Sequence, residues 1–147
     1  MIYISHRGNI NGKNIEKENT IEYITKAIEL GFDVEIDVWY DNGFWLGHDN
    51  PITKISNDFF KNDKLWCHAK NLEAIENLAL LHVKYFWHEN DKYTLTSNNL
   101  IWTYPGQKLC STSICVLPEL DLNNTAKDIY SCYGICSDFI IKWKNKI

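Results

Sequence analysis

The sequence of 147 residues predicts an α/β fold built on a largely parallel sheet. Short apolar runs typical of strands alternate with amphipathic stretches typical of helices, and this alternation indicates βα units. Clusters of polar side chains also follow several of the strand-like runs. Parallel α/β folds place their chemistry at these carboxyl ends of the strands.

Eight apolar runs are expected to form strands. In chain order they are Ile2–Ser5, Asp33–Trp39, Phe44–Leu46, Leu65–His68, Tyr85–His88, Leu100–Tyr104, Ser113–Leu117 and Ile135–Ile140. The tripeptide Asp41-Asn42-Gly43 lies between the second and third runs and is a hairpin turn signal. One antiparallel pair is therefore expected to interrupt the parallel pattern.

Three stretches are expected to form helices, namely Asn19–Leu30, Leu72–His82 and Asn124–Cys132. In each of the first two, apolar residues recur at helical spacing along one face. Gly31 is a good stop for the first helix, and Asn71 is placed to cap the start of the second.

Composition limits the class of protein. The chain holds 15 basic and 19 acidic residues, a formal charge of −4, and 45% of its residues are hydrophobic, so residues 1–147 are expected to fold as one domain. The acidic balance argues against nucleic acid as a partner. No apolar run is long enough for a transmembrane segment. Five cysteines, an odd number, and no signal peptide predict a cytoplasmic protein with free thiols.

Five polar clusters lie at the predicted carboxyl ends of strands. They are His6-Arg7-Gly8, Glu35-x-Asp37, His48-Asp49, His68-x-Lys70 and His88-Glu89. Glu35 and Asp37 are two residues apart on one strand, so their side chains share a face. If that face is interior, the two charges need a cation, and carboxylate oxygens suit Mg²⁺ or Ca²⁺. The alternative is a pair of acids that faces solvent.

Two histidines flank this acid pair in the sequence. His6 and His48 can exchange protons near neutral pH, and Arg7 offers a planar fork suited to a phosphate. Together with a divalent cation, these groups make a coherent set for cleaving a phosphodiester.

Four motifs within the first 49 residues resemble the glycerophosphodiester phosphodiesterases in order and spacing. They are Ser5-His6-Arg7-Gly8, Glu18-Asn19-Thr20, the segment Gly31-Phe32-Asp33-Val34-Glu35-Ile36-Asp37-Val38, and His48-Asp49. That family is similar to phosphatidylinositol-specific phospholipase C and is built on a TIM barrel. The resemblance implies metal-dependent hydrolysis of a glycerophosphodiester through a cyclic phosphate.

The resemblance also implies a role for each motif residue. His6 and His48 would be the catalytic acid–base pair, and Glu35 and Asp37 would bind the metal. Arg7 would hold the phosphate, and Glu18 would support the substrate site from the first helix. Further along the chain, Lys70 matches a substrate-binding lysine of the family, and Trp102 matches a tryptophan that lines its substrate cavity. The alternative for Trp102 is an aromatic residue that only packs in the core.

The chain departs from the family pattern at His68, which stands where the family has a third metal-binding glutamate. An imidazole nitrogen in place of an anionic oxygen favours softer ions. Three outcomes follow for a metal site of Glu35, Asp37 and His68. It keeps Mg²⁺ or Ca²⁺ more weakly, it prefers Mn²⁺ or Zn²⁺, or it has lost catalysis.

The length restricts the barrel that the resemblance implies. A full barrel of eight βα units needs about 250 residues, and the chain has 147. The expected fold is therefore a reduced TIM-type (β/α) barrel with fewer and shorter helices in its C-terminal half.

The sequence leaves three functions open. The first is a metal-dependent phosphodiesterase acting on a small phosphodiester substrate. The second is a catalytically inactive module that binds a phosphate or a headgroup in the same site. The third is a cysteine-centred redox or zinc function. An incomplete barrel would leave sheet edges exposed, so a homodimer is a further possibility.

Overall fold

The computed structural model describes residues 1–146, and within them ten strands form a single mixed sheet. The strands are β1 (Ile2–His6), β2 (Asp33–Tyr40), β3 (Phe44–Leu46), β4 (Thr53–Ile55), β5 (Leu65–Ala69), β6 (Lys84–Phe86), β7 (Tyr93–Leu95), β8 (Ile101–Thr103), β9 (Ser113–Val116) and β10 (Gly134–Ser137).

Seven of these strands run parallel, in the order β6-β5-β2-β1-β10-β9-β8, so β1 lies in the middle. The other three are antiparallel additions. The pair β3 and β4 extends the sheet from the end of β2, and β7 pairs with β8. The turn before β3 uses Asn42 and Gly43 at positive φ, as the hairpin signal predicted.

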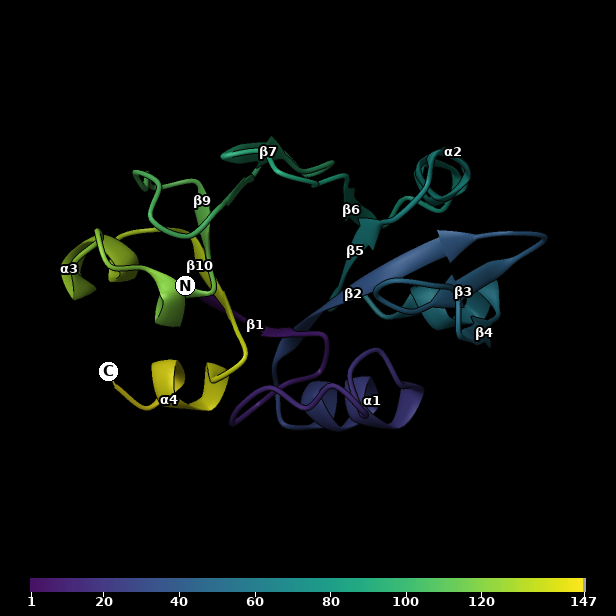
Figure 1. Cartoon of the computed structure of the whole chain (residues 1–147), viewed down its shortest axis with the longest axis horizontal. Coiled ribbons are helices and arrows are strands. Elements are labelled where there is room, and N and C mark those ends of the chain that lie inside the picture. The colour runs from purple at the N-terminus through teal and green to yellow at the C-terminus, as the bar shows by residue number, and fades with distance from the viewer. Residues whose placement is uncertain (147) are drawn as a thin grey trace.

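The helices lie around the outside of the curved sheet (Figure 1). They are α1 (Ile21–Glu29), α2 (Leu72–Leu80), α3 (Ala126–Tyr130) and α4 (Ile140–Lys144), with two 3₁₀ turns, η1 (Asn57–Lys61) and η2 (Pro118–Leu120). Thr20 caps α1 and Asn71 caps α2 through their side chains. The apolar faces of α1 and α2 pack on the outer face of β2 and β5, around Val34, Ile36 and Cys67.

The inner face of the sheet is apolar toward the amino ends of the strands and polar at their carboxyl ends. Its buried apolar cluster includes Ile4, Trp66 and Trp102. Further along the strands, the register places His6 beside Glu35, and Asp37 beside His68. Neighbours in parallel register point to the same side of a sheet, so these polar side chains meet on the inner face.

The expected reduced TIM-type barrel is wrong. The protein has a mixed sheet of ten strands with four short helices in residues 1–146, and helices do not alternate regularly with the parallel strands. The reason lies in the connections between the later parallel strands, two of which contain no helix. The chain from β6 to β8 carries the antiparallel strand β7, and a loop without a helix joins β8 to β9. Within the described part of the chain, β5 is the only strand that pairs with β6, and the Tyr85 backbone of β6 bonds to Ser97, which lies outside any strand. Paired strands therefore do not close the sheet into a barrel.

Most individual elements agree with the sequence prediction. The eight predicted strands and three predicted helices are present, with ends shifted by a few residues. The exception is Ile135–Ile140, where the strand stops at Ser137 and α4 begins at Ile140. The short edge strands β4 and β7 were not predicted. No helix in residues 1–146 has the length and hydropathy to cross a membrane.

Candidate metal and phosphate site

A cavity of about 620 Å³ opens at the carboxyl ends of the parallel strands. Most of the side chains predicted from the sequence line it. The predicted residues in its lining are His6, Arg7, Glu35, His48, His68, Lys70 and Trp102. Five segments that are far apart in the chain therefore supply these seven side chains to one site.

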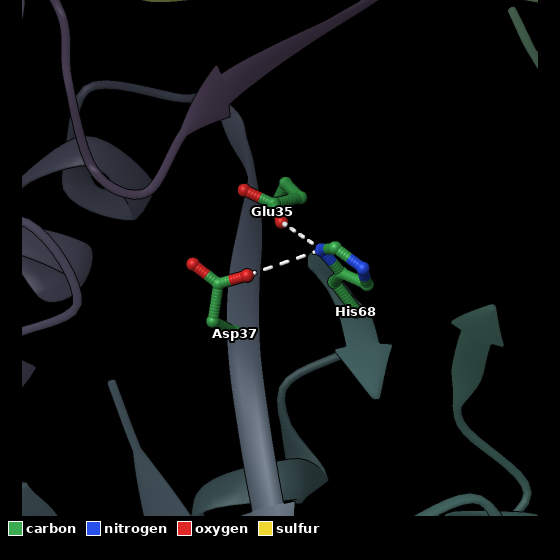
Figure 2. Close-up of side chains that lie close together, drawn as sticks. All are labelled: Glu35, Asp37 and His68. Atoms are coloured by element: carbon green, nitrogen blue, oxygen red, sulfur yellow. Dashed lines mark ion pairs between the residues drawn. The ribbon is translucent and has the colours of Figure 1, made fainter. Parts of the chain in front are cut away.

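Glu35, Asp37 and His68 form a compact cluster at the inner wall (Figure 2). Both acids lie on β2 and His68 lies on the neighbouring β5. The Nδ1 atom of His68 is 3.1 Å from Asp37 Oδ1 and 3.6 Å from Glu35 Oε1. One ligand atom from each of the three residues can be chosen so that all lie within 4.8 Å of one another. This spacing suits a shared cation.

Asp37 is fixed from its other side by residues that precede α1. The side chain of Asn19 donates to Asp37 Oδ2 over 2.8 Å and accepts from the Asp37 backbone N–H over 2.9 Å. Arg7 Nε lies 2.9 Å from the same Oδ2. Arg7 and Asn19 both have a positive φ, an uncommon conformation for residues other than glycine that clusters at functional sites.

The buried oxygens of the acid pair fit a metal ion. Glu35 Oε2 is buried without a hydrogen-bond partner among residues 1–146, and its neighbour His6 Nε2 lies 3.8 Å away. Asp37 Oδ1 is also buried, and its contact is the 3.1 Å ion pair with His68. Buried polar atoms are nearly always satisfied, so Glu35 Oε2 is an oxygen that can accept a cation or a water. Two carboxylates and one imidazole are a donor set that accepts divalent cations.

The charges in the cluster also act on one another. Burial by itself would raise the pKa of Asp37, but contact with His68 and the charges of Arg7 and Lys70 hold that pKa well below its usual range. Burial likewise disfavours protonated His68, yet its contacts with Asp37 and Glu35 raise its pKa to about 9. Without a metal, His68 is therefore a cation at neutral pH and balances the acid pair.

The second nitrogen of His68 sets the orientation of its ring. Nε2 lies 2.7 Å from the backbone carbonyl oxygen of His88 and donates a hydrogen bond to it. The Nδ1 atom is left facing the carboxylates, where it carries a proton or, after losing it, can bind a metal. Such an outer contact is the usual way in which proteins orient a metal-binding histidine.

The raised pKa of His68 predicts how stability depends on pH. Its folded-state pKa of about 9 lies above the unfolded value of 6.5, so its contribution is fully present below pH 6.5 and is lost as the pH rises through about 9. We expect urea unfolding in the presence of a chelator to show a steeper loss of stability across this range for the wild type than for His68→Gln. Parallel curves for the two proteins would show that His68 is not charged.

His6 is held by a second network. Its Nδ1 atom donates to Asp138 Oδ1 over 2.7 Å, and its Nε2 atom lies 3.8 Å from Glu35 Oε2. Asn9 connects this network to the contacts around Asp37. Its side-chain amide donates to Asp138 and to Glu18, and Glu18 contacts Arg7. Burial lowers the pKa of His6, but Asp138 and Glu35 outweigh burial and the net pKa is raised. Because Asp138 occupies Nδ1, Nε2 is the atom free to exchange a proton with a ligand.

Glu119 on η2 positions Asp138 without lining the cavity. Its carboxylate accepts from Ser137 Oγ over 2.8 Å and from the Asp138 backbone N–H over 2.9 Å. The network therefore runs from Glu119 through Asp138 to His6. Neither Glu119 nor Asp138 was among the site residues predicted from the sequence.

We expect Glu119→Gln to lower the free energy of unfolding by about 1–3 kcal/mol, because a hydrogen bond from the N–H of Asp138 to a charged acceptor is lost or weakened. Urea denaturation measures the loss. The matched control is Glu76→Gln, since Glu76 is an exposed residue on α2. Equal stabilities for the two variants would contradict the positioning role.

The remaining predicted residues have different degrees of exposure. His48 follows β3, pairs with Asp49 over 2.8 Å and keeps 43% of its side chain exposed. Glu18 lies in the turn before α1, not in the helix, and contacts Arg7 over 3.4 Å. Lys70 Nζ is 3.7 Å from Asp37 Oδ1. Trp102 stacks on Phe86 at 4.3 Å, so it belongs to the core and to the cavity wall at once.

Asn9, Asn19 and Lys13 complete the site and were not predicted to take part in it. Of the three, only Asn19 carried a sequence signal, because it belonged to the motif Glu18-Asn19-Thr20. Comparisons with family models, with curated proteins and with solved structures found no match to this chain.

Proposed function

We propose that the protein is a metal-dependent phosphodiesterase that hydrolyses a glycerophosphodiester-type bond, as the resemblance of its first 49 residues to that family suggests. The observation that carries the proposal is a single cavity lined by His6, His48, Arg7 and Lys70 beside the cluster of Glu35, Asp37 and His68. Groups that exchange protons, groups that bind phosphate and groups that bind a metal thus surround one space.

The protein's side chains would divide the reaction between them. Arg7 and Lys70 hold the phosphate oxygens. One imidazole of the pair His6 and His48 accepts the proton of the hydroxyl that neighbours the phosphate, and that oxygen attacks phosphorus. The other imidazole donates a proton to the departing alcohol as its P–O bond breaks. The roles reverse when water opens the cyclic phosphate.

Glu35, Asp37 and His68 would hold the divalent metal. Mg²⁺ or Ca²⁺ is the first expectation, because the two carboxylates supply oxygen ligands. Mn²⁺ or Zn²⁺ is the alternative, because the nitrogen of His68 suits softer ions. A divalent cation bound there supplies positive charge to the phosphate oxygens. Loss of the proton from His68 Nδ1 accompanies its use as a ligand.

Removal of the metal tests the proposal directly. We expect purified protein to hydrolyse glycerophosphodiesters with added Mg²⁺, Ca²⁺ or Mn²⁺ and to lose this activity when a chelator is present in excess, because two buried carboxylates then lack their cation. Release of the alcohol is measured by a coupled assay. A folded protein that turns over no glycerophosphodiester with any of these ions would refute the proposal.

A second candidate, a binding module without catalysis, is favoured by one observation. Protonated His68 already neutralises part of the charge of Glu35 and Asp37, so the cluster can persist without a metal. Calorimetry separates the two candidates. Binding of glycerol phosphate that is insensitive to a chelator, with no hydrolysis of the diester, supports the module.

The cytoplasmic location and the homodimer stay predictions. The five cysteines are free thiols. The metal-binding group found among residues 1–146 contains no cysteine.

A further inference from the structure

Three permanently charged basic side chains line the site cavity, namely Arg7, Lys13 and Lys70. Two of them are already paired with Asp37. Arg7 Nε lies 2.9 Å from Asp37 Oδ2, and Lys70 Nζ lies 3.7 Å from Asp37 Oδ1. Arg7 also contacts Glu18 over 3.4 Å. Part of the positive charge that these two residues offer to a phosphate is therefore neutralised within the protein.

Lys13 differs from the other two because no carboxylate among residues 1–146 forms an ion pair with it. Its side chain is exposed, so water solvates the ammonium group. The acids that line the same cavity are Glu35, Glu89 and Asp138. Asp138 is paired with His6, and Glu35 belongs to the metal-binding cluster. Among the three permanent cations, Lys13 therefore keeps its charge available to a ligand.

The backbone on both sides of Lys13 is fixed. The N–H of Gly12 donates to the Asp138 carbonyl over 2.7 Å, and the N–H of Asn14 donates to the Asn9 side chain over 3.0 Å. Asn9 in turn donates to the Asp138 carboxylate over 2.8 Å, so both anchors belong to one network. The flexible four-carbon stem of the lysine can therefore turn while its point of attachment beside the cavity stays in place.

Lys13 also lies at the boundary of a second cavity, of about 460 Å³, between the β1–α1 loop and the β3–β4 hairpin. The residues that line both cavities are all basic, namely Arg7, Lys13 and His48. The acids of the second cavity are Glu16, Glu18 and Asp49. Glu18 contacts Arg7 and Asp49 pairs with His48, so these two acids are not partners of Lys13. The place where the two cavities meet thus suits an anion.

We propose that Lys13 is a further phosphate-binding residue, which contacts the phosphate of the substrate from the β1–α1 loop where the two cavities meet. The proposal rests on the proposed function, because it concerns the phosphate that Arg7 and Lys70 hold. An ammonium group suits this role, since its three N–H donors can turn toward whichever phosphate oxygens the bound substrate presents. Lys13 lies outside the four motifs that carry the family resemblance, so the resemblance assigns it no role.

Variants of two lysines on the same loop test the proposal. Lys13→Gln should weaken the binding of glycerol phosphate to the whole protein by about five- to tenfold, between the effects of an exposed ion pair and of a buried charge-assisted hydrogen bond. Lys17→Gln is the matched control, because Lys17 is exposed on the same loop and lines neither cavity. Each variant removes one positive charge, so a difference between them reports a contact and not the overall charge of the protein.

Calorimetry measures the binding, once with added Mg²⁺, Ca²⁺ or Mn²⁺ and once with a chelator. Both lysines are exposed, so both variants are expected to fold, and circular dichroism checks this. We expect the control to bind glycerol phosphate as the wild type does.

A third variant separates the charge of Lys13 from the structure of its loop. Lys13→Arg keeps the charge and should bind glycerol phosphate within about threefold of the wild type. In hydrolysis assays, Lys13→Gln should raise KM more than it lowers kcat, because a phosphate contact is lost while His6 keeps its position. A lower kcat with an unchanged KM would instead mean that the loop had displaced His6, and it would contradict the proposal.

The outcomes that overturn this proposal are distinct from those that overturn the proposed function. If Lys13→Gln and Lys17→Gln bind glycerol phosphate equally well, or if Lys13→Arg loses as much affinity as Lys13→Gln, Lys13 does not bind the phosphate, but the site at Arg7 and Lys70 stands. If the wild type binds no glycerol phosphate under any of these conditions, the phosphate site fails, and the proposed function and this proposal fail with it.

Discussion

Replacement of His6 by alanine is expected to lower phosphodiester hydrolysis by about 10²–10⁴-fold, the usual contribution of a general acid or base. The His6 ring is held at Nδ1 by Asp138, so Nε2 presents or receives a proton at a fixed place in the cavity. Alanine removes that atom and leaves the phosphate-binding groups in position. The steady-state rate with a glycerophosphodiester and saturating metal measures the effect.

The control for this prediction is His82→Asn. His82 follows α2, does not line the site cavity, and has a φ of 54°, a conformation that asparagine tolerates better than alanine. We expect this variant to keep wild-type activity. A His6→Ala protein that is folded and retains activity within about threefold of the wild type would remove His6 from the chemistry.

The inner cluster could be predicted because its signal is local. Glu35 and Asp37 alternate with Val34, Ile36 and Val38 on one strand, and this period of two puts the acids on one face and the apolar residues on the other. The parallel sheet then brings His68 beside Asp37. The helix cap at Asn71 could be predicted for the same reason, because Asn71 accepts a hydrogen bond from the backbone N–H of a residue only three positions away.

The partners of His6 could not be predicted because they depend on tertiary structure. Asp138 is 132 positions from His6 in the chain, and the strand β10 that directly precedes it lies beside β1 only in the folded sheet. The same applies to Glu119, which bonds to Asp138 across 19 positions. Neither residue belongs to a motif that indicates acid–base chemistry.

The prediction of strand at Ile135–Ile140 failed for a related reason. Isoleucine favours strands locally, but tertiary contacts override this preference. Ser137 and Asp138 are tied to Glu119 on η2, and Ile140 is buried in the cluster that packs α4 against the sheet. The barrel prediction failed because the first 49 residues carried the resemblance, whereas the later connections decide whether helices alternate with strands.

Replacement of Asp37 by asparagine is expected to have the largest effect on stability, a loss of about 3–5 kcal/mol in the metal-free protein. Asp37 is fully buried, and three cationic side chains, Arg7, His68 and Lys70, contact its carboxylate. The asparagine variant would leave these charges buried with less compensation. The pKa of His68 would then fall, because contact with Asp37 is the largest influence that raises it.

Urea denaturation with a chelator measures this loss, and Asp58→Asn is the matched control. Asp58 forms an ion pair of 2.7 Å with Lys61 on η1, but both side chains are exposed, so water replaces the lost partner and stability should hardly change. The contrast isolates burial, because both substitutions remove one carboxylate charge from a short ion pair. If the two variants lost the same stability, the Asp37 cluster would be hydrated like a surface pair, and its buried oxygens would no longer indicate a metal site.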